Sequence, residues 1–137
     1  MTPMLKKHLT ALLLTAITMW LLAGLWHKVI MAQFYIDETA ATHEGTGIIF
    51  LAYLILAGLM LLLFPRKPWF KNNLLSGLLF GAVIGLLWVF PHELAMAGAH
   101  GEPLGYVFFN AVWHMVEQGA GGIVIAMLYG RSTSSDN

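Results

Sequence analysis

The sequence predicts an all-α, polytopic membrane protein: a bundle of four transmembrane helices with both termini on the cytoplasmic side. The 137-residue chain is 58% hydrophobic and only 10% charged, whereas an average soluble domain carries roughly 25% charged residues. Four long segments contain almost no charged residue, and the basic residues gather in alternate connections between them. These observations together predict the fold and its orientation.

Length and composition limit the classes of protein. A chain of this length accommodates a single domain, and a domain this small cannot hide so many apolar side chains from water. We therefore expect the lipid bilayer as its main partner. The zero formal net charge argues against a nucleic-acid partner. The chain has no cysteine, so a metal or haem site would have to use His, Glu, Asp or Met.

Each apolar segment is long enough to cross a bilayer as a helix. About 20 residues, rising about 1.5 Å each, cover ~30 Å of hydrocarbon. The first segment is longer than the apolar region of a secretory signal and lacks a clear cleavage site, so we expect it to be retained. The predicted spans are residues 9–30, 46–64, 73–91 and 105–129, joined by a cytoplasmic loop at 65–72 and outer loops at 31–45 and 92–104.

The charged residues predict the orientation. Bases lie mainly in the N-terminal tail, the second connection and the C-terminal tail, whereas acids lie in or beside the first and third connections. The positive-inside rule therefore places both termini and the 65–72 loop in the cytoplasm. The bases that set this orientation are Lys6, Lys7, Arg66, Lys67, Lys71 and Arg131, against Lys28 alone towards the other side.

Glycines and one proline predict how the third helix packs and ends. Gly77, Gly81 and Gly85 recur every four residues, and such a strip lets two helices approach closely in lipid. We favour packing within the chain over a self-dimer seam. Pro91 is expected to kink or end this helix. The small residues of the fourth helix are the candidate partner of the strip: Gly119, Ala120, Gly121 and Gly122.

The fourth segment carries the sharpest local signal for a site. Asn110, His114, Glu117 and Gly121 follow helical spacing and form one polar stripe. Glu117 is the only acid well inside a span, so it should be protonated, paired or facing a cavity. His114 lies one turn away. A proton-sharing pair and a purely structural interhelical hydrogen bond are both open interpretations.

Further polar residues are predicted near the outer side. Counted from the cytoplasmic helix ends, His27 and His92 lie ~27 Å up, His114 ~22 Å and Glu117 ~18 Å. These depths predict an outward-facing polar pocket. The full set of candidate ligand-binding or proton-sharing residues is His114, Glu117, Asn110, His27, His92, Glu93 and Glu44.

A metal or haem site is an alternative use of these histidines. The set His27, His92, His114 and Glu117 suits Zn, Cu or Fe, and haem needs only two facing histidines. Four-helix di-iron proteins use two Glu-x-x-His motifs, which this sequence lacks. We favour interfacial histidines satisfied by backbone or water.

Short motifs resemble those of a group of small, uncharacterised bacterial four-helix membrane proteins with a domain-of-unknown-function label. They are Ala-Gly-Leu-Trp-His at residues 23–27, Phe34-Tyr35, and Trp-His-Met-Val-Glu-Gln-Gly at residues 113–119. The resemblance covers most of the chain and implies the architecture and a bacterial inner (cytoplasmic) membrane. It implies no activity and no catalytic residue.

Three functions fit these patterns. The first is a non-enzymatic membrane protein whose pocket binds a small ligand, or an accessory subunit of a larger membrane complex or homo-oligomer. No phosphate-binding loop, Gly-x-Ser-x-Gly or His-Glu-x-x-His motif indicates an enzyme. The second is a minimal proton-coupled transporter using His114 and Glu117. The third is a haem- or metal-binding redox bundle using His27, His92 and His114.

Overall fold

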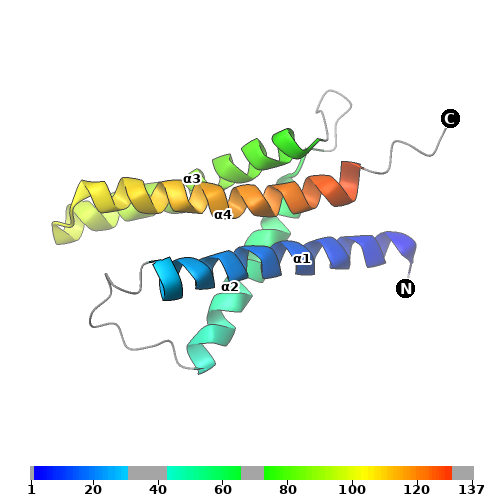
Figure 1. Cartoon of the computed structure of the whole chain (residues 1–137), viewed down its shortest axis with the longest axis horizontal. Helices are drawn as coiled ribbons and strands as arrows, with labels where there is room; N and C mark the ends of the chain where they lie inside the picture. The colour runs from blue at the N-terminus through cyan, green and yellow to red at the C-terminus, as the bar shows by residue number, and fades with distance from the viewer. Residues whose placement is uncertain (1, 31–42, 66–72, 131–137) are drawn as a thin grey trace. The chain divides into compact units, whose positions relative to one another are not determined.

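The computed structural model describes residues 2–30, 43–65 and 73–130, and the regular structure in these ranges is helical throughout (Figure 1). Four helices in them, α1 to α4, are long and apolar enough to cross a membrane. No strand occurs in the described ranges. The predicted all-α fold with four membrane-spanning helices is therefore confirmed.

The first helix, α1, spans Pro3–Leu25 and begins earlier than the predicted span at residue 9. Its start is capped by Thr2, whose hydroxyl oxygen accepts the backbone N–H of Leu5 at 3.3 Å. Pro3 suits the first helical turn, where its missing N–H costs no hydrogen bond. Lys6 and Lys7 thus mark where the apolar segment begins, but the helix itself begins before them, at Pro3. A π-helical turn, Trp26–Ile30, follows α1.

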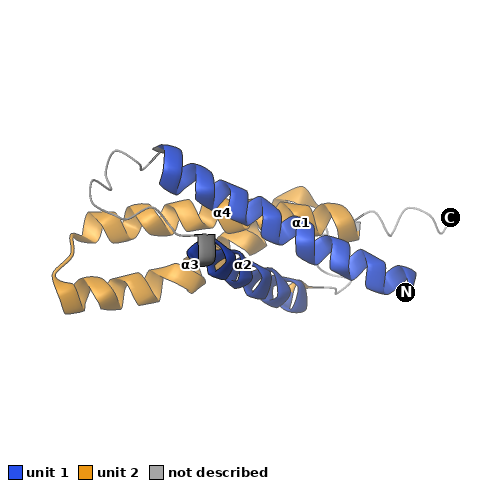
Figure 2. Cartoon of the chain, turned by 90° about the horizontal axis from the view of Figure 1, so that it is seen from below, with its two compact units in different colours: residues 1–63 blue, residues 64–137 orange. Residues whose placement is uncertain are grey.

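Residues 1–63 form one compact unit, made of α1 and α2, His43–Leu63 (Figure 2). Within it, α2 runs obliquely to α1 (Figure 1). The rings of Trp20 and Phe50 meet edge to face, with centroids 5.6 Å apart. One buried line along α1 has four-residue spacing, as expected for a helix face: Ala11, Thr15, Met19 and Ala23.

Residues 64–137 form the second unit, which contains α3, Leu74–His100, and α4, Leu104–Gly130. Asn73 caps the start of α3, because its side-chain oxygen accepts the N–H of Ser76 at 2.9 Å. Gly101 ends α3 in the left-handed region, with a φ of 71°. Glycine adopts this conformation without steric cost. Residues 101–103 then turn the chain directly into α4.

The structure corrects the predicted end of the third helix. Pro91 does not end the helix, because α3 continues through it to His100. The predicted outer loop at 92–104 therefore shortens to residues 101–103. A kink at Pro91 stays a prediction. A proline removes one backbone N–H and crowds one carbonyl, whereas the following Leu, Ala and Met residues favour helix. The first strong stop signal after them is Gly101.

Glycines bring α3 and α4 into backbone contact. Only hydrogen fits at Gly77, Gly81 and Gly85, because a Cβ atom at any of them would overlap the backbone of α4. The α4 residues whose backbone the added Cβ atoms would overlap are, in the same order, Gly122, Gln118 and His114. Gly119, Gly121 and Gly122 of α4 are all buried. Near the ends of the unit, ring pairs Phe64–Phe80 and Phe90–Phe108 add aromatic contacts, with centroids 5.2 and 5.5 Å apart.

Several predictions concern parts of the chain that lie outside the described residues. They include nearly all of the cytoplasmic loop at 65–72 and residues 31–42 of the first outer loop. The last residues of that predicted loop, from His43, are already helical in α2. The sequence also predicts one four-helix bundle. The structure defines two helical hairpins, and their assembly into a bundle stays a prediction.

Substitution of Gly81 by alanine tests the α3–α4 contact. The added methyl group would overlap the Gln118 carbonyl, a backbone atom that cannot rotate away. Overpacking of this kind costs about 1–3 kcal/mol of the free energy of unfolding. We expect Gly81→Ala to lower the unfolding temperature in detergent while the assembled mass stays unchanged. The control is Gly98→Ala on the same helix, where a Cβ meets nothing within 4 Å. Equal unfolding temperatures for the two variants would contradict the contact.

Candidate functional site

The candidate site lies on α4. Because α4 is helical without interruption from Leu104 to Gly130, residues three or four apart share one face of it. Asn110 and His114 are partly buried on this face, whereas Glu117 is completely buried. The rest of the helix is apolar enough to cross a bilayer. A carboxyl group is therefore held deep in an apolar element.

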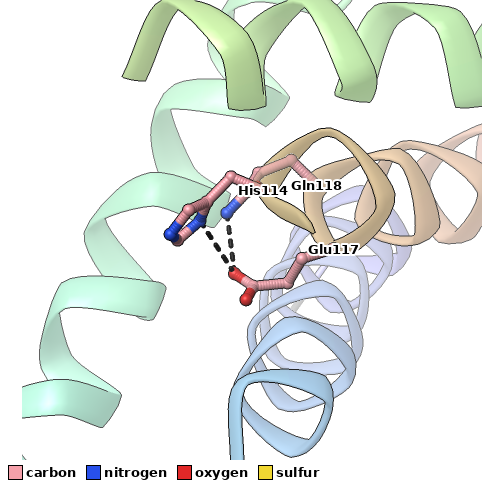
Figure 3. Close-up of polar contacts among 3 residues, drawn as sticks. All are labelled: His114, Glu117 and Gln118. Atoms are coloured by element: carbon pink, nitrogen blue, oxygen red, sulfur yellow. Dashed lines mark hydrogen bonds and ion pairs between the residues drawn. The ribbon is translucent and has the colours of Figure 1, made fainter. Parts of the chain in front are cut away.

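Two α4 side chains converge on the same oxygen of Glu117 (Figure 3). The Gln118 side-chain amide donates a hydrogen bond from Nε2 to Oε1 of Glu117, at 2.8 Å. The Nδ1 atom of His114 lies 3.8 Å from that oxygen. This separation is too long for a hydrogen bond but lies within the range of an ion pair when the imidazole is protonated.

Burial differs among the three side chains and decides what the site can do. Glu117 and Gln118 are both 0% exposed, whereas the His114 side chain is 16% exposed. A buried carboxylate is expensive unless it is neutralised or paired. Proton transfer between the carboxyl group and the imidazole changes both charges together. The arrangement is thus suited to holding a proton, with His114 as the more accessible member.

Gln118 was missed as a site residue by reasoning from the sequence. Gln118 points about 100° away from Glu117 around the helix, but it follows His114 by four residues and therefore lies on the same side of α4 as that member of the stripe. A signal was nevertheless present, because a second long polar residue follows the acid directly in an apolar span. Such a residue is expected to be buried and hydrogen-bonded. Adjacent side chains meet here because both are long enough to bend together.

The remaining predicted residues belong to other helical segments, and the side chain of one of them is outside the described part of the structure. His92 is exposed and Glu93 is partly buried on α3. His27 is exposed and belongs to the other unit. Glu44 lies in the first turn of α2, and its side chain is outside the described part of the structure. The shared pocket lined by these residues stays a prediction.

The metal and haem alternatives can be compared with the described side chains. Among residues 2–30, 43–65 and 73–130, no group of three or more His, Asp or Glu residues is arranged to hold a metal ion. The predicted metal set combines His27 of one unit with His92, His114 and Glu117 of the other. A haem held by His27 with His92 or His114 would likewise join the two units. Testing it requires knowing how the units are placed relative to one another. Both alternatives stay predictions.

Comparison with known proteins gives no further assignment. The chain matches no family model, and it has no significant match among curated proteins or solved structures. The resemblance to small bacterial four-helix membrane proteins therefore stays a prediction.

Two substitutions of Glu117 test whether the buried Gln118 amide needs it as a hydrogen-bond acceptor. Glu117→Gln keeps an oxygen that can accept the Gln118 amide N–H, whereas Glu117→Leu leaves that donor buried without its acceptor. An unsatisfied buried donor costs about 1–3 kcal/mol. We expect Glu117→Leu to unfold at a lower temperature than Glu117→Gln in the same detergent. Val116→Leu, at an exposed neighbouring position, is the control and should behave like the unmodified protein. A Glu117→Leu variant at least as stable as Glu117→Gln would contradict the hydrogen bond.

Proposed function

We propose that this chain is a non-enzymatic, multi-pass membrane protein that takes up and releases a proton at Glu117, with His114 as its partner. One observation carries the proposal: a completely buried carboxyl group has an imidazole nitrogen 3.8 Å away in a helix apolar enough to cross a membrane. Ionisable residues inside membrane-spanning helices are costly, and they commonly mark proton or ion pathways.

Two contacts of Glu117, with His114 and with Gln118, lie within α4 itself. The first of them joins two titratable groups, which supports a proton site. Glycine contacts between backbones support the association of α3 with α4.

The same proposal includes a location and an orientation. The distribution of basic residues supports both termini in the cytoplasm of a bacterial inner membrane. In that orientation, counting along α4 puts Glu117 ~18 Å and His114 ~22 Å from its cytoplasmic end. The histidine is then nearer the outer surface, and protons would reach Glu117 from that side. Only residues 101–103 join α3 to α4, without a separate soluble segment between them, which suits an accessory subunit.

Infrared difference spectroscopy between two pH values tests the proton site. In liposomes, we expect a carboxyl C=O band that appears as the pH falls and is missing from Glu117→Gln. Replacing His114 by phenylalanine should change the pH at which the band appears, because it removes the nearest described titratable partner.

Glu102→Gln is the control for this measurement. Glu102 is exposed in the turn between α3 and α4, so its substitution should leave the Glu117 band in place. Identical difference spectra for the unmodified protein and Glu117→Gln would refute the proposed function.

Cysteine labelling tests the orientation. The chain has no cysteine, so single cysteines introduced at Glu102 and at Ser134 report without background. In intact cells or spheroplasts, a membrane-impermeant maleimide should label Glu102→Cys and should reach Ser134→Cys only after lysis. The opposite pattern would place the termini outside and reverse the direction of proton access.

A further inference from the structure

One glycine of α3 lies against both residues that contact Glu117. A Cβ atom on Gly85 would overlap the His114 carbonyl and would come within 2.9 Å of Oε1 of Gln118. His114 and Gln118 are one turn apart, so both face α3 at the same place. The α3 backbone at Gly85 therefore packs against both His114 and Gln118, the two residues that approach the Glu117 carboxyl group.

The Gln118 side chain has two chemically different ends. Its Nε2 donates to Glu117, whereas its Oε1 accepts no N–H or O–H from the described residues and lies against Gly85. A glycine Cα offers two weak C–H donors and no acceptor, so it suits the oxygen end of the amide. A carboxylate oxygen is an acceptor only, so it suits the nitrogen end. Both neighbours thus favour the same orientation of the amide.

Space and burial also restrict Gln118. The residue is 0% exposed, and its backbone carbonyl is the atom that a Cβ on Gly81 would overlap. The backbone of Gln118 thus packs against Gly81, and its side-chain oxygen packs against Gly85. With the main chain and the amide both fixed against α3, the N–H that reaches Glu117 has little freedom to move.

We infer that Gln118 is a positioning residue for the proton site: α3, through Gly81 and Gly85, holds the Gln118 amide so that it donates to Oε1 of Glu117. The inference rests on the proposed function, because it assigns to Gln118 the orientation of the carboxyl group that carries the proton. It makes the separation of α3 and α4 a determinant of the hydrogen bonding at Glu117. A change in the packing of α3 against α4 then alters the hydrogen bond at the carboxyl group through Gln118.

The frequency of the Glu117 C=O band tests this assignment. A hydrogen bond to a carbonyl oxygen lowers its stretching frequency, so loss of the Gln118 donor should raise it. We expect Gln118→Met, which keeps the length of the side chain and removes its N–H, to move the band to higher wavenumber without abolishing it. Val116→Met, at the exposed neighbouring position, is the matched control and should leave the frequency unchanged.

A second variant tests the part played by α3. Gly85→Ala displaces the Gln118 amide oxygen and the His114 backbone, and it should shift the band in the same direction as Gln118→Met. Gly98→Ala, whose methyl group has open space, should not. A general loss of stability would lower the unfolding temperature without moving the frequency, so both quantities are measured for every variant.

A measurement on the unsubstituted protein keeps the inference testable if these variants do not fold. Solid-state NMR with ¹⁵N in glutamine side chains and ¹³C in glutamate carboxyl groups should show dipolar coupling from the 2.8 Å hydrogen bond, and Glu117→Gln should remove it. An unshifted band in folded Gln118→Met, or no coupling in the unsubstituted protein, overturns the role of Gln118. The proposed function fails separately, if no Glu117 band responds to pH.

Discussion

The backbone contact between α3 and α4 is the constraint on which the rest of this unit depends. In lipid, burying an apolar side chain against another helix brings little hydrophobic gain, because the hydrocarbon around it is equally apolar. Close packing has to supply the attraction. The glycines of α3 permit it, since an added methyl group at Gly77, Gly81 or Gly85 would overlap the neighbouring backbone. The large apolar side chains are left on the outside, where Leu79, Leu87 and Val116 are exposed.

The polar cluster depends on that contact. His114 and Gln118 are the α4 residues set against Gly85, and both approach Oε1 of Glu117. A buried, ionisable group is thus placed beside the most tightly packed part of the structure. Dense packing restricts the rotamers of the neighbouring side chains, so a small number of hydrogen bonds suffices to define the carboxyl geometry. The hydrogen bond from Gln118 to Glu117 offsets part of the cost of burying these polar atoms.

Much of the fold could be predicted from the sequence, because hydrophobic length and charge placement are coarse signals that lipid imposes on every span. The four helices follow directly from them. Helix ends were less predictable. Lys6 and Lys7 interrupt the hydrophobic run but lie within α1, and Pro91 lies within α3, which continues to His100. Charged residues indicate where the apolar segment ends. Capping residues such as Thr2 and Gly101 indicate where the helix begins or ends.

The site was only partly predictable for a related reason. Helical periodicity brings His114 and Glu117 together in the sequence, and the structure sets them 3.8 Å apart. Gln118 follows His114 by four residues, so periodicity places the two on one face, but it does not show that the Gln118 amide reaches the Glu117 carboxyl group. The contact of its amide with Gly85 joins residues far apart along the chain, which no local pattern specifies.

The glycine contacts also have a regular order along the hairpin. Gly77 meets Gly122, Gly81 meets Gln118 and Gly85 meets His114, so each step of one turn on α3 matches one turn on α4. A strip of equivalent glycines does not by itself distinguish this alignment from one slipped by a whole turn. The connection at 101–103, which begins with the left-handed Gly101, has too few residues to absorb such a slip. The length of that turn therefore fixes the alignment of α4 on α3 and determines which α4 residues lie opposite Gly85. Because those residues are His114 and Gln118, it also determines which side chains surround the Glu117 carboxyl group.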